Sequence, residues 1–141
     1  MKINKALIKE KINEYNKLYF NSELPKCEIR IKSAYRYYGL FECKYHEKYK
    51  KATFKTITIS DLYDYTDENL RDVLVHEMIH YYLIEKKKLF HDSIKHGPEF
   101  QKMAKEFNEK YNLNIKILED WGSIKLLPTT SKFLFTILNI F

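Results

Sequence analysis

The HExxH motif at residues 76–80 constrains this chain more than any other stretch, because it lies inside the apolar run of residues 74–84. On a helix, residues four apart share one face, about 5–6 Å apart at Cβ, so His76 and His80 can hold one zinc ion. Glu77 lies beside them and can take a proton from a water molecule at that metal. Buried ionisable side chains need a partner, and a metal ion is the natural one. The motif therefore predicts a buried, metal-carrying helix.

A catalytic zinc ion needs a third protein ligand and keeps a fourth position open for water. His96 precedes Pro98, which suits the first position of a new helix, so we expect His96 at a fixed turn. His91 falls in residues 88–93, where we expect an exposed loop. Glu99 is a further candidate, although the helix dipole also favours an acidic residue in a first helical turn. We favour His96 as the third ligand, and the residues alone leave His91 and Glu99 open.

Three motifs in a fixed order resemble the SprT-like metallopeptidase family, which includes the DNA–protein-crosslink protease Spartan. They are YFNSELP at residues 19–25, HExxH at 76–80 and HGPEF at 96–100, and the general similarity runs from residue 3 to residue 118. The resemblance implies one zinc ion per chain, bound by three histidines, with a glutamate as the catalytic base. The residues so implied are His76, His80, His96 and Glu77. It also implies a minimal zincin-like core, in which a small, mainly antiparallel sheet packs against the HExxH helix.

The chain departs from this resemblance after residue 118. Many relatives carry a four-cysteine zinc ribbon there, whereas this chain has only Cys27 and Cys43 and no CxxC pair. We therefore assign residues 1–118 to the SprT-like domain and residues 119–141 to a tail without the ribbon. Two cysteines do not make a secreted disulfide framework, so we expect both to be packing residues in strands.

Apolar periodicity predicts an α+β fold in a single domain. Ile8, Ile12 and Tyr15 are spaced as on one face of a helix, Thr66 suits a helix N-cap, and Pro98 suits a helix start. The predicted elements are an N-terminal helix at 3–20, strands at 27–31, 39–45 and 54–60, the HExxH helix at 67–86, a following helix from Pro98 with Phe100, Met103, Ala104 and Phe107 on its inner face, and a short strand at 115–117.

Positive charge is concentrated in the first part of the chain. Residues 1–60 carry 14 Lys and Arg against 6 Asp and Glu, a net charge of +8, whereas the whole chain carries +6. Aromatic residues lie among these cations, and rings between cations suit single-stranded nucleic acid. The same charges can instead keep one face of a hairpin in contact with water. No motif in the sequence decides for contact with nucleic acid. The candidate nucleic-acid contacts are Tyr37, Tyr38, Lys48, Lys50 and Lys51.

The chain has no apolar stretch long enough for a signal peptide or a membrane span. The longest apolar stretch of the tail, Phe133–Phe141, has nine residues, whereas a spanning helix needs about 20. We therefore expect no membrane contact and a reduced, cytoplasmic setting.

Together these patterns predict a zinc-dependent endopeptidase, and the resemblance implies that its substrates include DNA-associated or DNA-crosslinked proteins. Tyr38, Tyr45 and His91 are unranked candidates for stabilising the oxyanion. One alternative is a metal-stabilised module that binds nucleic acid or protein and cuts little, and another is a zinc hydrolase of a small amide. An intact Glu77 speaks against the binding module, because binding alone does not need that carboxylate.

Overall fold

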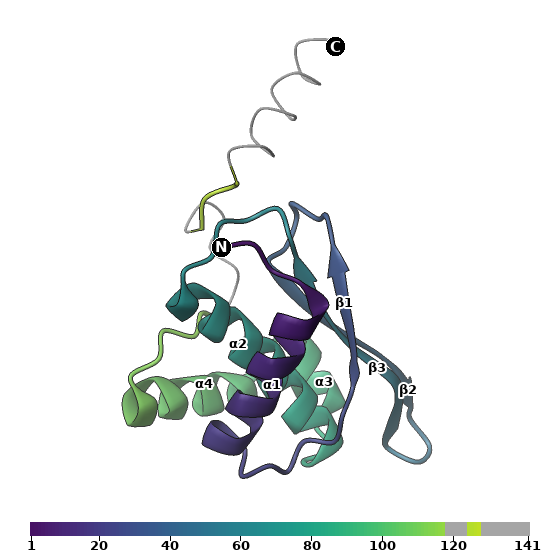
Figure 1. Ribbon diagram of the computed structural model, residues 1–141. Helices are drawn as coiled ribbons and strands as arrows, with labels where there is room; N and C mark the ends of the chain where they lie inside the picture. The colour runs from purple at the N-terminus through teal and green to yellow at the C-terminus, as the bar shows by residue number, and fades with distance from the viewer. Residues whose placement is uncertain (118–123, 128–141) are drawn as a thin grey trace.

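The main helices and strands follow one another along the chain in the order predicted from the sequence (Figure 1). The structure, a computed structural model, describes residues 1–117 and 124–127. Within these residues it contains four helices and one three-stranded sheet, which confirms the predicted fold class. The elements are α1 (Lys5–Tyr19), β1 (Glu28–Lys32), β2 (Gly39–His46), β3 (Lys51–Ser60), α2 (Asp67–Glu85), α3 (Phe90–Ile94) and α4 (Pro98–Tyr111).

The sheet is mixed, with β3 in the middle of the order β1-β3-β2. β2 and β3 form an antiparallel hairpin, which is the longer ladder, and β1 runs parallel to β3 with Ile29 opposite Ile57. The chain between β1 and β2 passes the end of β3, where the Ser60 N–H donates to the Tyr38 carbonyl at 2.8 Å. β2 lies at one edge of the sheet and β1 at the other, and one of the two pairings in the expected, mainly antiparallel sheet is parallel.

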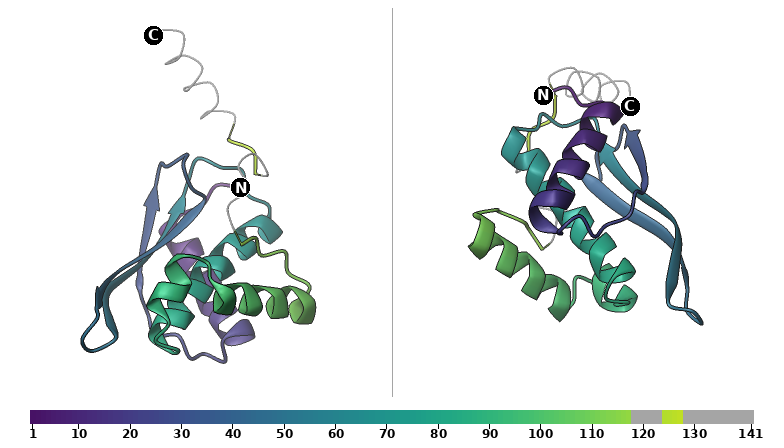
Figure 2. Two further views of the ribbon diagram at one scale, coloured as in Figure 1. Left: turned by 180° about the vertical axis from the view of Figure 1, so that it is seen from behind. Right: turned by 60° about the horizontal axis from the view of Figure 1, so that its bottom comes forward.

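The HExxH helix α2 forms the centre of the fold. Thr66 caps it as expected: its side chain accepts from the Asn69 N–H at 3.1 Å, and the Asn69 side chain accepts from the Thr66 N–H at 3.3 Å. The helix contacts β2, β3 and the three other helices, and Leu74, Met78 and Ile79 are fully buried. Figure 2 shows the helices gathered on one face of the sheet. A helix that is apolar on nearly every side is stable only when it is enclosed in this way.

The prediction of a loop at residues 88–93 is wrong for most of this range, because α3 begins at Phe90. Five residues are too few to form a stable helix by themselves, so contacts with the rest of the fold hold this one. The Phe90 ring stacks on the Tyr45 ring of β2 at 4.1 Å between centroids, with only 3° between the planes. Ser93, at the other end of α3, is completely buried.

The strand expected at residues 115–117 is also wrong, since this segment is irregular. The Asn108 side chain of α4 takes the place of a neighbouring strand. It accepts from the Ile115 N–H at 2.8 Å and donates to the Ile115 carbonyl at 3.1 Å. The side chain thus satisfies both backbone groups of Ile115, which is buried as the apolar pattern indicates.

Only residues 124–127 of the expected tail are described, and residues 119–123 and 128–141 lie outside the described residues. The described piece runs antiparallel to residues 62–64: the Leu127 N–H donates to the Leu62 carbonyl at 2.9 Å, and Tyr63 pairs with Leu126. Both cysteines of the chain are free and half-buried. Among the described residues, no helix is both long enough and apolar enough to cross a membrane.

Candidate metal centre

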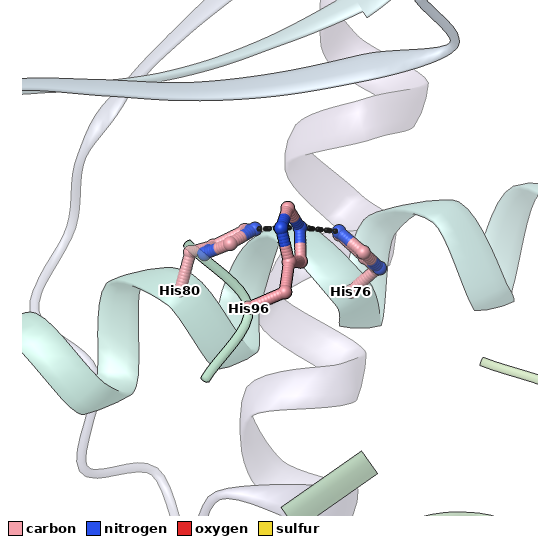
Figure 3. A group of neighbouring side chains, drawn as sticks. All are labelled: His76, His80 and His96. Carbon is pink, nitrogen blue, oxygen red and sulfur yellow. Dashed lines mark hydrogen bonds between the residues drawn. The ribbon is translucent and has the colours of Figure 1, made fainter. Parts of the chain in front are cut away.

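Three histidine side chains from two parts of the fold converge beside α2 (Figure 3). His76 and His80 project from α2, and His96 comes from the turn before α4. The Nε2 atom of His96 lies 3.1 Å from Nε2 of His80 and 3.2 Å from Nε2 of His76. Candidate ligand atoms of all three lie within 4.8 Å of one another. Nitrogens bound at about 2.0–2.1 Å to a tetrahedral zinc ion would be roughly 3.3 Å apart, so the spacing fits.

The hydrogen bonds of two rings determine where their protons lie. His76 Nδ1 is 2.6 Å from the Lys116 carbonyl oxygen, which can only accept, so this nitrogen carries the proton. Ser93 Oγ donates to the His80 carbonyl at 3.3 Å and therefore accepts from His80 Nδ1 at 2.9 Å. Both rings then present the lone pair of Nε2 to the common centre, as metal-binding histidines with a fixed outer nitrogen do.

Burial keeps these rings neutral. It lowers the pKa of His76 to about 4, against the weaker opposing effect of the Lys116 carbonyl. Burial, followed by the neighbouring His76 and His96 rings, lowers the pKa of His80 to about 3, and burial lowers the pKa of His96. Neutral imidazole is the form that binds a metal ion. The lone pairs of His76 and His80 point to one centre, to which His96 Nε2 also comes close, and three such nitrogen donors fit a divalent metal.

Phe100 forms an apolar floor under the three imidazoles. Its ring centroid lies 4.9 Å from that of His76, 4.5 Å from that of His80 and 4.8 Å from that of His96. The side chain is completely buried. Because an apolar side chain that excludes water lowers the local dielectric constant, the charge of a metal ion would act more strongly on groups bound at this centre.

Glu77 lies beside the nitrogen atoms, where α2 faces β2. Its Oε2 atom is 4.0 Å from His76 Nε2, and the residue is only 5% exposed. Gly39, at the start of β2, allows the strand to come this close. A Cβ atom on Gly39 would lie 3.1 Å from Glu77 Cγ and 3.0 Å from Val73 Cγ1. The missing side chain of Gly39 thus sets the distance between the edge strand and the carboxylate-bearing turn of α2.

The two other candidates for the third ligand lie elsewhere. His91 is exposed, as expected, and its Nε2 atom is 2.7 Å from Glu47 Oε1 on the β2–β3 hairpin. Glu99 is exposed in the first turn of α4. Neither belongs to the group of candidate metal ligands, which contains His96.

The three oxyanion candidates have contacts of their own. Tyr38 is 3% exposed, and its hydroxyl accepts from the Ile124 N–H at 3.4 Å. Tyr45 is stacked on Phe90, and His91 contacts Glu47. The assignment of an oxyanion partner to one of these three stays a prediction.

The five candidate nucleic-acid contacts do not form one surface. Tyr38 is buried, with its ring edge-on to Tyr63 at 4.7 Å, because the chain between β1 and β2 packs into the core. Tyr38 therefore has no face on which a base could stack, and the expectation for this residue is corrected. Tyr37 precedes β2, whereas the three lysines follow it at the hairpin turn. The eight residues of β2 separate the two groups by roughly 25 Å.

Sequence reasoning missed two groups that orient the site. Ser93 holds His80, and the Lys116 carbonyl holds His76. A backbone carbonyl leaves no signal in the amino-acid type, so Lys116 could not have been found from the sequence. The residue type gives no signal for Ser93 either, because serine is mostly exposed in proteins.

Comparison with known families agrees with this geometry. The model of the SprT-like family matches residues 8–119, which include every residue of the centre described above. Searches of curated proteins and of solved structures gave no significant match.

Proposed function

This chain belongs to the SprT-like family, and from that premise we propose that it is a zinc-dependent endopeptidase with one zinc ion held by His76, His80 and His96. The observation that carries the proposal is the convergence of three neutral imidazole nitrogens beside a buried carboxylate. Three nitrogen ligands with a fourth position left for water are the pattern of a catalytic zinc site. The family match supports a metallopeptidase-like domain, and the cleavage of protein chains is our proposal.

In this proposal, Glu77 is the general base. When bound, a zinc ion supplies a Lewis acid that polarises the scissile carbonyl and acidifies a water molecule. Glu77 takes the proton from the attacking water and later delivers it to the leaving amine. His76 and His80 are kept in the ligating tautomer by the Lys116 carbonyl and by Ser93. The buried ring of Phe100 excludes water from one side of the centre.

The edge strand β2 supports a peptide substrate rather than a small amide. It lies at the end of the strand order and contacts α2. An extended peptide can add to such an edge through backbone hydrogen bonds, which would bring a peptide bond across the face of α2 near Glu77. A small amide is too short to form such a row of backbone hydrogen bonds with the strand.

The test is cleavage of a disordered protein substrate by the zinc-loaded protein, followed by mass spectrometry. We expect internal cleavage that stops after zinc is removed with a chelator and returns when zinc is added back. His91→Ala serves as a matched control for the metal, because His91 is an exposed histidine outside the centre, and this variant should keep its zinc. Absence of cleavage by the loaded protein, or cleavage that survives removal of the metal, would contradict the proposal.

We further propose that its substrates include proteins bound to DNA. The support is the family resemblance and the hairpin turn, where Lys48, Lys50 and Lys51 are exposed and Tyr49 is 72% exposed. The Lys48 Nζ atom lies 5.5 Å from the Tyr49 ring centroid, so cation and ring form a compact contact surface. An exposed ring among cations suits an unpaired base.

Single-stranded DNA binding should therefore fall steeply as salt rises. Replacing Lys48, Lys50 and Lys51 together by Ala should reduce the slope of log K against log salt by up to about 2, because each lost phosphate contact removes about 0.7. The control is the triple Ala variant of the exposed residues Lys86, Lys87 and Lys88, which loses the same charge away from the hairpin. If the two triple variants show the same slope, or if the protein binds no DNA at low salt, the DNA proposal is wrong and the peptidase proposal is untouched.

The alternative function is a metal-stabilised binding module. Such a protein would retain zinc and bind its partner, but mass spectrometry would find no cleavage products. The placement of Glu77 speaks for the enzyme, because a carboxylate beside the metal ligands can take a proton from water, which a binding module does not need.

A further inference from the structure

The backbone of His96 is in an unusual conformation. Its φ angle is 52°, in the left-handed region that residues with a side chain rarely adopt. The His96 N–H donates to the Ser93 carbonyl at 3.1 Å, and the Gln101 side chain donates to the His96 carbonyl at 2.8 Å. A conformation of this kind persists only where neighbouring groups hold it, so the turn that presents the third imidazole needs support from outside itself.

Asp92 of α3 supplies most of that support. Its carboxylate accepts from the Glu99 N–H at 3.1 Å and from the Phe100 N–H at 3.0 Å, and its backbone carbonyl accepts from the Gly97 N–H at 2.8 Å. Pro98 has no N–H. Asp92 therefore satisfies the free donors at the start of α4, although it belongs to a different helix, and its negative charge suits that end of the helix.

The close approach of this carboxylate explains two other residues of the HGPEF motif. A Cβ atom on Gly97 would lie 2.6 Å from Asp92 Oδ2, so no side chain fits at that position while Asp92 holds the turn. Phe100, bound through its N–H, is the ring that lies under all three imidazoles. Asp92 thus fixes both the turn that carries His96 and the floor of the centre.

We propose that Asp92 is the positioning residue for His96: by tying the start of α4 to α3, it holds the third imidazole where a metal ion needs it. This inference rests on the proposed metal centre. The next residue of α3, Ser93, holds His80, so α3 orients one ligand of α2 and the ligand in the turn before α4. Asp92 itself is not one of the candidate metal ligands, and it acts through its hydrogen bonds to Gly97, Glu99 and Phe100.

The test measures zinc affinity of the full chain by competition with a chromophoric chelator. Asp92→Ala should weaken zinc binding by about 10–100-fold, as is typical when the partner that orients a ligand is lost. Asp92→Asn keeps one acceptor oxygen and should have a smaller effect of the same sign. If the Ala variant does not fold, the Asn variant is decisive by itself. Unchanged affinity in a folded variant would overturn the proposal.

A second variant separates positioning from general stability, because equal losses of zinc affinity in it and in Asp92→Ala would contradict the proposal. The control for lost helix capping is Asn4→Ala, because the Asn4 side chain accepts from the Leu7 N–H at 2.8 Å at the start of α1. This variant should lose stability and keep its zinc affinity.

The same measurements keep this inference apart from the proposed function. If zinc affinity depends on Asp92 but no cleavage is found, the positioning role of Asp92 is supported and the peptidase proposal is wrong. If cleavage depends on zinc but Asp92→Ala binds zinc as tightly as the unsubstituted protein, the peptidase proposal is supported and the positioning role of Asp92 is wrong.

Discussion

Replacing Glu77 by Gln should abolish proteolysis while leaving zinc bound. The amide has nearly the same shape as the carboxylate but cannot take a proton from water. General acid–base catalysis contributes about 10²–10⁴-fold, so kcat/KM should fall by that factor, which corresponds to about 3–5 kcal/mol of barrier. Zinc should stay because the converging ligand atoms belong to the three histidines and not to Glu77. Cleavage rates and zinc content measured on one preparation check both parts.

The matched control is Glu85→Gln, the same chemical change on the same helix. Glu85 Oε2 is 3.3 Å from Lys55 Nζ, and both side chains are partly exposed, so its loss should change neither zinc content nor cleavage appreciably. A Glu77→Gln variant that cleaves at the unsubstituted rate would rule out Glu77 as the base. A variant that loses zinc would show instead that Glu77 supports the metal centre.

The outline of the fold could be predicted because its strongest signals are local. The buried helix α2, its Thr66 cap and the start of α4 at Pro98 all follow from residue types at fixed spacing. The sequence favours His96 for the same reason, since it lies two residues before a helix start, on constrained backbone. The structure brings His96 to the α2 histidines.

Features that depend on contacts between distant segments could not be predicted. α3 exists because Phe90 meets Tyr45 and because Ser93 is enclosed, and neither contact is visible in five residues of sequence. Residues 115–117 look like a strand, but Asn108 satisfies the backbone of Ile115 instead. The burial of Tyr38 follows from the path of the chain past the end of β3, which composition does not reveal.

Replacing His96 by Ala should remove the zinc ion. Two imidazoles on one helix turn would remain, and a site with only two protein ligands holds zinc far more weakly than one with three. Because bound metal stabilises the folded state, the variant should also lose the rise in melting temperature that zinc gives the unsubstituted protein. His91→Ala removes an exposed imidazole that contacts Glu47, so it should bind zinc like the unsubstituted protein.

The most direct test of the metal centre is the zinc content per chain of three proteins purified in parallel and analysed by mass spectrometry of the metal. We expect one zinc ion in the unsubstituted protein, one in His91→Ala and almost none in His96→Ala. A full equivalent of zinc in His96→Ala, or its loss in His91→Ala, would contradict the assignment of the third ligand and with it the proposed mechanism.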